Sequence, residues 1–234
     1  MNHHICGYTD YNFDCVIKFG GSLLIDAEKM HHAIQALEIC RLNGKKLLVI
    51  PGGGPTDKAI EKIDQKYTLS AETHHAACAR AQDQTGLMIC DPIFSKYLRP
   101  CTTLAEARFI SDQHLIPVLL PSQIIFTMDP FQKTWDITSD GIAVWFSWVI
   151  QSPITMVLTN VDGIFPINSD FAQAKPLQSI SAQELITFGH TAVDRCVPEF
   201  ILKRGGKVWV GNGMYSDRLY KALIGEETIG TFII

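Results

Sequence analysis

The stretch DCVIKFGGS, residues 14–22, joins a short apolar run to a lysine and two glycines. The run at 15–19 has the length and composition of a buried β-strand, and Gly20-Gly21 marks the turn that ends it. A lysine in this place has two interpretations: it is solvated beside a tight turn, or it belongs to a phosphate site. The other motifs of the chain distinguish the two.

A second glycine turn, Gly52-Gly53-Gly54 in VIPGGGP, follows a strand predicted at 46–50. Glycines let an anion approach bare backbone N–H groups, and a helix that begins after the turn adds the positive end of its dipole. Ligands of open α/β sheets bind at the carboxyl ends of strands, where both turns fall. Neither turn matches the Walker or dinucleotide patterns. Two such turns, one beside Lys18, favour a phosphate site of another kind.

The alternation of strand and helix continues along the chain. Apolar spacing, helix caps at Asp26 and Ser70, and the stop at Gly44 predict helices at 26–44, 56–66, 70–90, 102–114, 141–150, 181–187, 192–204 and 216–224. Further strands are predicted at 116–120, 154–159, 207–211 and 228–234. This order predicts an α/β protein with a mainly parallel sheet covered on both faces. We see no linker or repeat, so we expect one domain over residues 1–234.

Composition narrows the class of protein. The 234 residues include 20 basic and 24 acidic side chains, a net charge of -4, so we expect no nucleic-acid or membrane partner. The longest apolar runs are far shorter than the roughly 20 residues of a spanning helix, and no signal pattern opens the chain. The seven cysteines are odd in number and lack CxxC spacing. These features predict a cytoplasmic protein with reduced thiols, and no metal site, although His3, His4 and Cys6 leave a weak metal alternative.

Two acidic motifs lie in the second half of the chain. WDITSDGIA, residues 135–143, places Asp136 and Asp140 four residues apart, on one face if the segment is helical. Asp140 either caps the helix that follows or holds a catalytic lysine in place. TNVDGIF, residues 159–165, reads locally as a strand followed by an ordinary Asp-Gly turn.

Taken together, VIKFGGSLL, VIPGGGP, ITSD and VLTNVDGIF, in that order, resemble the amino-acid kinase superfamily over about residues 14–234. The resemblance implies a three-layer αβα sandwich with an open sheet, the acceptor in the N-terminal half, and ATP with Mg²⁺ in the C-terminal half. It implies that Lys18 contacts the transferring phosphoryl group and that Asp140 holds Lys18 in position. It also implies that backbone N–H groups bind the phosphates, from Gly20, Gly21, Gly53 and Gly54. The remaining ATP site would comprise Ser22, Thr159, Asn160, Asp162, Gly163 and Phe165. The acceptor site would comprise Gly52, Gly53, Gly54, Lys58, Asp83 and Asp136.

One departure bears on the acceptor. Some members carry a second catalytic lysine where this chain has Val193-Asp194, which is similar to uridylate kinases and indicates a phosphate-monoester acceptor. HHAACARAQDQTG, residues 74–86, with WDITSDGIAVW resembles the branch that phosphorylates aminomethyl-furanmethyl phosphate. A UMP kinase and a non-catalytic ATP-binding protein of the molybdenum-storage kind are the alternatives. The family also implies a homo-oligomer, from dimer to hexamer.

Overall fold

The computed structural model describes residues 10–169, 174–189 and 191–234. Its first half contains β1 (Cys15–Phe19), the short 3-10 helix η1 (Gly21–Leu24), α1 (Ala27–Leu42), β2 (Leu47–Pro51), α2 (Gly54–Tyr67), α3 (Ala71–Ile89), β3 (Leu98–Cys101), α4 (Leu104–Asp112), β4 (Ile116–Leu119) and α5 (Ser122–Met128). Its second half contains α6 (Ser139–Val149), β5 (Thr155–Thr159), β6 (Ser179–Ile180), α7 (Ala182–Thr187), α8 (Cys196–Arg204), β7 (Val208–Asn212), α9 (Arg218–Ile224) and β8 (Thr231–Ile233).

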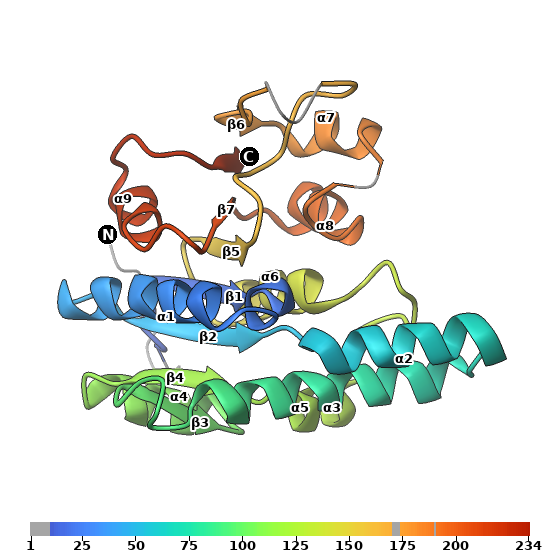
Figure 1. The fold of residues 1–234 in the computed structure, drawn as a ribbon, viewed down its shortest axis with the longest axis horizontal. Coiled ribbons are helices and arrows are strands. Elements are labelled where there is room, and N and C mark those ends of the chain that lie inside the picture. Colours follow the sequence, from blue (N-terminus) through green and yellow to red (C-terminus); the bar gives the residue numbers. More distant parts are fainter. Residues whose placement is uncertain (1–9, 170–173, 190) are drawn as a thin grey trace.

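The described strands form one sheet in the order β3-β4-β2-β1-β5-β7-β8-β6. Its pairings are parallel except that of β7 with β8, which confirms the mainly parallel sheet. The chain builds outward from β1 in one direction through β2 and then in the other through β5 (Figure 1). The carboxyl ends of these three strands therefore lie side by side, which is where α/β sheets bind ligands.

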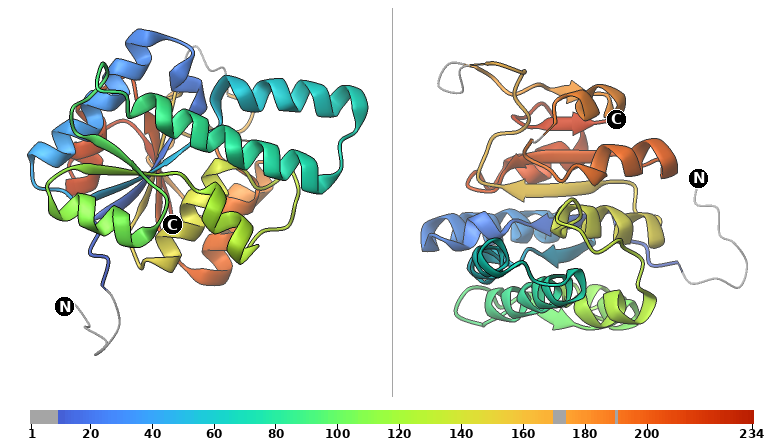
Figure 2. Two further views of the ribbon diagram at one scale, coloured as in Figure 1. Left: turned by 90° about the horizontal axis from the view of Figure 1, so that it is seen from below. Right: turned by 90° about the vertical axis from the view of Figure 1, so that its right-hand side faces the viewer.

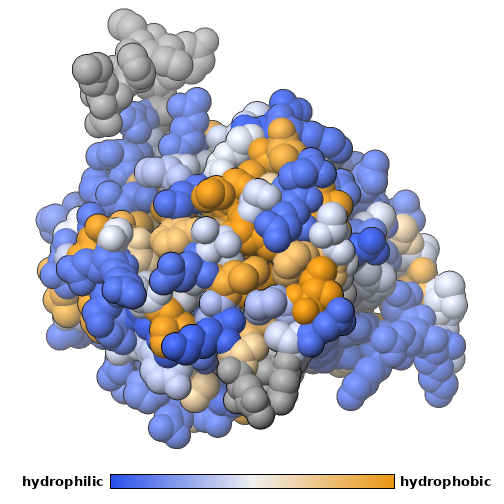
Figure 3. Space-filling view, turned by 90° about the horizontal axis from the view of Figure 1, so that it is seen from above, coloured by the Kyte–Doolittle hydropathy of each residue, from blue (hydrophilic) through white to orange (hydrophobic). Residues whose placement is uncertain are grey.

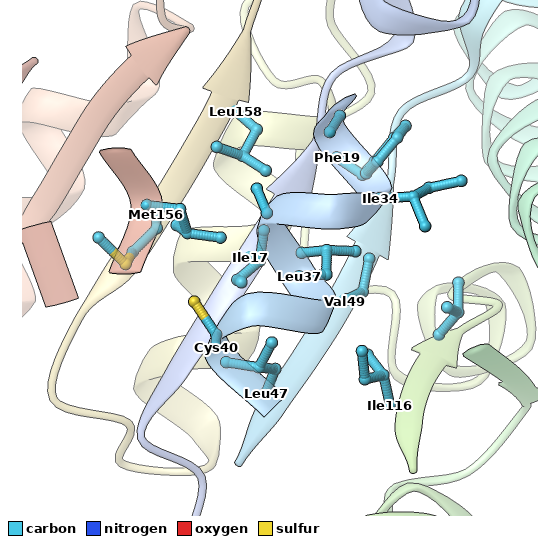
Figure 4. Packing of buried hydrophobic residues seen from close by; sticks show 14 of the residues in the cluster. Ile17, Phe19, Ile34, Leu37, Cys40, Leu47, Val49, Ile116, Met156 and Leu158 are labelled. Atoms are coloured by element: carbon cyan, nitrogen blue, oxygen red, sulfur yellow. The ribbon is translucent and has the colours of Figure 1, made fainter. Parts of the chain in front are cut away.

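Alternation along β1 decides which side chains face which helix. Ile17 and Phe19 point to the face covered by α1, where Leu37 packs against the sheet (Figure 4). Val16 points to the opposite face and packs in the cluster that includes α6. Because successive strand residues alternate in direction, Lys18 shares the face of Val16 and lies under α6.

Helices cover both faces of the sheet, as expected for a three-layer sandwich. Figure 2 shows α1 and α9 on one side of the strands and α6 and α8 on the other. The predicted caps are confirmed, since Asp26 accepts from the first-turn amides of α1 and Ser70 from Thr73 in α3. The antiparallel pair α2–α3 extends beyond the sheet (Figure 1), and α2 has no buried residue.

Four short elements were not predicted from the sequence: η1, β3, β6 and α5. Two of the four residues of β3 are exposed and one of them is Pro100, and β6 has only two residues, so neither gives an apolar run. Helix α5 has only seven residues and begins directly after Pro121. Short elements of this kind are fixed by tertiary contacts rather than by a local pattern.

Two surface properties bear on the class of protein. Over the described ranges, none of the helices combines the length and apolar character that a membrane span needs. Viewed from above, apolar side chains gather in the middle of the face formed by the C-terminal part (Figure 3). The exposed large apolar residues of that part include Ile167, Ile186, Ile229 and Ile234.

Thr231 ties the C-terminal strand to the loop that follows β5. Its buried hydroxyl accepts from Ile164 N at 2.8 Å and donates to the Leu177 carbonyl at 2.6 Å. We expect Thr231→Val to lower the free energy of unfolding by about 1–3 kcal/mol, because a buried N–H loses its acceptor without a change of side-chain shape. Urea denaturation measures this, with Thr231→Ser as the control that keeps the hydroxyl. A Val variant as stable as the Ser variant would contradict the assigned hydrogen bonds.

Candidate active site

The two glycine turns contact each other backbone to backbone. A Cβ atom on Gly21 would lie 2.6 Å from Gly54 N, and one on Gly52 would lie 2.9 Å from Gly21 N. Real Cβ atoms do not approach so closely, so a side chain at either position would push the turns apart. Gly54 also has φ +61°, which favours glycine. The result is a surface of bare backbone between the ends of β1 and β2, as a phosphate site requires.

Not every amide of this surface is available to a ligand. Gly20 N donates to the Leu158 carbonyl at 2.9 Å, and Gly52 N donates to the Phe19 carbonyl at 2.8 Å. These bonds continue the strand pairings, so the expectation that the Gly20 N–H binds phosphate is corrected. Gly20 instead allows close approach of β5, since a Cβ there would clash with Leu158 O. The N–H groups of Gly20 and Gly52 are therefore used within the protein, and the half-buried Ser22 follows in η1.

Lys18 and Asp140 form a buried ion pair at the end of β1. Lys18 Nζ lies 2.8 Å from Asp140 Oδ1, and the two side chains are 12% and 7% exposed. Burial alone would lower the pKa of the ammonium, but the charge and hydrogen bond of Asp140, with the charges of Asp194 and Asp57, hold the pKa above its usual value. The capping interpretation of Asp140 is wrong, because Thr138 is the N-cap of α6. Lys18 is therefore a fully charged cation at the glycine turns.

Asp194 completes this charged cluster. In the sequence it was noted only because it stands where some family members carry a second catalytic lysine. Its carboxylate accepts from Thr138 N and Oγ1, both at 2.7 Å, and from Gly141 N at 3.1 Å. Its own N–H donates to Asp140 Oδ2 at 3.2 Å. Burial and the nearby Asp140 charge raise the pKa of the Asp194 carboxyl to about 6. Asp194 thus holds the first turn of α6, and with it Asp140, over Lys18.

The residues expected near the nucleotide follow β5. Asp162 accepts from Asn212 Nδ2 at 3.0 Å and from an Arg218 guanidinium nitrogen at 2.7 Å, and that guanidinium stacks 3.7 Å from the centre of the Tyr215 ring. Asn212, Tyr215 and Arg218 were not predicted, because they lie 50 to 56 residues further along the chain than Asp162. Gly163 has φ +148° and packs against Thr231. Thr159 is half-buried, Asn160 exposed and Phe165 half-buried beside them.

The residues expected to bind the acceptor do not gather in one place. Lys58 is 75% exposed and pairs with Glu61 at 2.8 Å. Asp83 accepts from Ser122 N at 3.1 Å and from the Ser122 hydroxyl, so its carboxylate holds the start of α5. Asp136 is exposed. A pocket near the glycine turns is lined instead by Asp57, one residue before Lys58, with residues from α3 and the segment before α6.

Metal ligands bear on the storage-protein alternative. Within the part of the chain that the structure describes, no group of three His, Cys, Asp or Glu side chains is arranged to hold a metal ion. His3, His4 and Cys6 lie outside the described residues.

Comparison with known proteins shows which family this chain belongs to. Residues 15–216 match the amino acid kinase family. The chain belongs to the amino acid kinase family. Membership makes the protein a phosphotransferase, as the motifs predicted.

Individual relatives agree with this membership. The chain is 28% identical over 219 residues to the [5-(aminomethyl)furan-3-yl]methyl phosphate kinase of Methanocaldococcus jannaschii, covering 94% of this chain and 97% of that protein. Among solved structures, the uridylate kinase of Archaeoglobus fulgidus superimposes with TM-score 0.71 at 20% identity, over 95% of this chain and 100% of that one. The UMP kinase of Bacillus anthracis gives 0.72 at 17% identity, over 94% of each chain. These likenesses confirm the predicted three-layer fold.

Substitution of Asp140 tests the ion pair in this kinase. We expect Asp140→Asn to reduce kcat by about 100-fold or more, because Lys18 loses the charge that orients it. The unfolding free energy should also fall by roughly 3 kcal/mol, since a buried cation is left without its closest partner. Steady-state kinetics beside urea denaturation measure both. Turnover within a few-fold of the unsubstituted kinase would show that the pair is not needed for catalysis.

The raised pKa of Asp194 makes a prediction about stability and pH. Between the ordinary value of 3.8 and about 6, the folded state binds a proton that the unfolded state does not. Stability is therefore lost as the pH rises from 3.8 to about 6, and the whole cost, on the order of 2–3 kcal/mol, is present above that range. Asp194→Asn avoids this cost, and its amide can accept from the two N–H groups while donating to Thr138 Oγ1. We expect this variant to match or exceed the unsubstituted kinase in unfolding free energy at pH 8.

The advantage should shrink as pH falls from 8 to 5, because the unsubstituted carboxyl then takes up its proton. Urea denaturation at pH 5, 6.5 and 8 measures the difference. The exposed Glu72→Gln is the control for loss of one charge. A difference between Asp194→Asn and the unsubstituted kinase that stays constant across this range would contradict the raised pKa.

Proposed function

We propose that this kinase transfers the γ-phosphoryl group of ATP to a small phosphate monoester, with aminomethyl-furanmethyl phosphate the best candidate. The buried Lys18–Asp140 pair beside two joined glycine turns carries the proposal of phosphoryl transfer. Phosphoryl transfer asks mainly for in-line positioning and for neutralisation of charge on the equatorial oxygens. An ammonium and bare amides at the same strand ends supply both.

ATP and the acceptor are assigned to opposite sides of β1. The bare backbone of the two glycine turns would bind the triphosphate at one end and the acceptor phosphate at the other, with Lys18 between them. Mg²⁺ bound with ATP would neutralise part of the phosphate charge. Because Asp140 already pairs with Lys18, and Asp194 already accepts three hydrogen bonds, we infer that phosphate oxygens supply most ligands of this ion. The nucleoside would lie near Asp162 and Arg218.

The identity of the acceptor is supported by the relative in Methanocaldococcus jannaschii, which spans nearly the whole chain. UMP is the second candidate. The solved UMP kinases are at most 20% identical to this chain and support the fold rather than the substrate. The carboxylate of Asp57 lines the pocket near the glycine turns. An anion there favours an amine-bearing acceptor over uracil, which carries no positive charge.

Assembly and location also stay predictions. We propose a homo-oligomer, which is supported by large apolar side chains exposed on the early helices, including Ile63 on α2 and Leu87 and Met88 on α3. We propose a cytoplasmic location on the same sequence grounds as before.

A screen of acceptors tests the proposed function. We expect ADP release to depend on a phosphate monoester, with aminomethyl-furanmethyl phosphate giving a higher kcat/KM than UMP, acetylglutamate or aspartate. Lys18→Ala should lower turnover by about 100-fold or more while ATP still binds, because its charge matters most in the transition state. Coupled ADP detection and calorimetric titration of ATP measure the two quantities. A carboxylate as best acceptor, or ATP binding without turnover of any acceptor, would overturn the proposal.

A further inference from the structure

A polar pocket opens between the α2–α3 pair and the segment that leads into α6. Asp57 lines it from α2, and Trp135 and Thr138 line it from the segment before α6. Helix α3 contributes His75, Cys78 and Gln82, among others. The spacing of these three residues places them on one face of the helix. The pocket is therefore built by three elements that are far apart in the sequence.

Three buried polar atoms around this pocket lack hydrogen-bond partners among the described residues. They are Asp57 Oδ1, His75 Nε2 and Gln82 Oε1. Gln82 is only 2% exposed, so water at the surface does not replace a partner. Buried polar groups are nearly always hydrogen-bonded, and each one left unpaired costs stability. Three of them around one pocket indicate that a ligand supplies the missing groups.

The chemistry of these atoms defines the ligand. The oxygens of Asp57 and Gln82 are acceptors. Burial, followed by the nearby charges of Lys133 and His74, lowers the pKa of the His75 imidazole, which therefore stays neutral and can accept at Nε2. Three acceptors, one of them an anion, call for a cation with several N–H donors. An ammonium group has three donors and one positive charge.

A structural role explains only part of Asp57. Its carboxylate is hydrogen-bonded by the Cys78 thiol and by the Gly53 N–H at the start of α2, where acids of first helical turns are often found. Neither contact brings a charge to the carboxylate, and Oδ1 lacks a hydrogen-bond partner among the described residues. The nearby lysines already have acidic partners: Lys18 pairs with Asp140, Lys58 with Glu61 and Lys133 with Asp129. Burial raises the pKa of the Asp57 carboxyl, so the charged form would gain from a cation.

The pocket adjoins the reaction centre. Asp57 packs against Gly53, whose neighbour Gly54 contacts Gly21, and Thr138 bonds to the Asp194 carboxylate. A phosphate seated on the glycine turns therefore leaves the rest of a small acceptor facing this pocket.

Trp135 gives the pocket an aromatic wall. Its ring stacks on His74 with centroids 4.9 Å apart and planes at 26°. Its indole N–H donates to Asp64 Oδ2 on α2 at 2.7 Å, which fixes the ring. A flat apolar surface beside an anionic end suits a planar ring that carries an aminomethyl group.

We propose that Asp57, His75 and Gln82 bind the ammonium group of the acceptor at the end remote from its phosphate. This subsite rests on the proposed function and names the part of the acceptor that the enzyme selects. It replaces Asp83 and Asp136, which were expected in the acceptor site but lie against Ser122 and at the surface.

Paired acceptors test the subsite. Steady-state kinetics compare aminomethyl-furanmethyl phosphate with an analogue in which a methyl group replaces the aminomethyl group. The unsubstituted kinase should favour the amine by about 30-fold or more in kcat/KM. Asp57→Asn keeps the shape and the acceptor for Gly53 N–H but loses the charge. It should raise the KM of the amine ester by about 30- to 100-fold, and leave the KM of the analogue and of ATP within about threefold.

Control variants separate recognition from stability. Gln82→Met should weaken discrimination by about tenfold, and the exposed Glu72→Gln should leave it unchanged although it removes the same charge as Asp57→Asn. An Asp57→Asn variant that slows both esters equally would overturn the subsite and indicate a structural role. Equal use of the two esters by the unsubstituted kinase would overturn the subsite but leave the phosphate-monoester kinase standing. Turnover of UMP alone, or of no phosphate monoester, would overturn the proposed acceptor and the subsite together.

Discussion

The contact between Lys18 and Asp140 constrains much of this molecule. An ammonium cannot be buried at the end of a central strand unless an anion meets it, because desolvation of an unpaired charge is too costly. The anion comes from the first turn of α6, so that helix must begin directly over the end of β1. Thr138 and Gly141, both bonded to the Asp194 carboxylate, fix where α6 begins. The position of one helix over the sheet thus follows from the buried charge of a single lysine.

The fold could be predicted largely from local pattern. The strand at 15–19 and the caps at Asp26 and Ser70 are short-range features, and the structure has them where expected. The glycine turns were placed correctly for the same reason. Their contact with each other was not foreseen, and neither was the use of the Gly20 amide within the sheet, because both depend on how neighbouring strands pair.

The contacts of the candidate site could be predicted well where charge and motif coincide, and poorly elsewhere. Lys18 and Asp140 sit together as the resemblance implied. Lys58 was expected in the acceptor site, yet it is exposed and paired with Glu61, while the adjacent Asp57 on another side of the helix lines the pocket. Gln82 and His75 carry no local signal that separates a pocket residue from a core residue. Only the packing of α3 against the segment before α6 shows which of their atoms remain unpartnered.

The backbone contact between Gly21 and Gly54 has a thermodynamic consequence. A phosphate cradle made of side chains must lose rotamer entropy each time substrate binds, which weakens binding. Here the surface has no side chains to order, and its shape is set by two strands already fixed in the sheet. Under the proposed function, little conformational freedom would be lost when two phosphates are brought together, so more of the binding energy would remain to oppose their mutual repulsion.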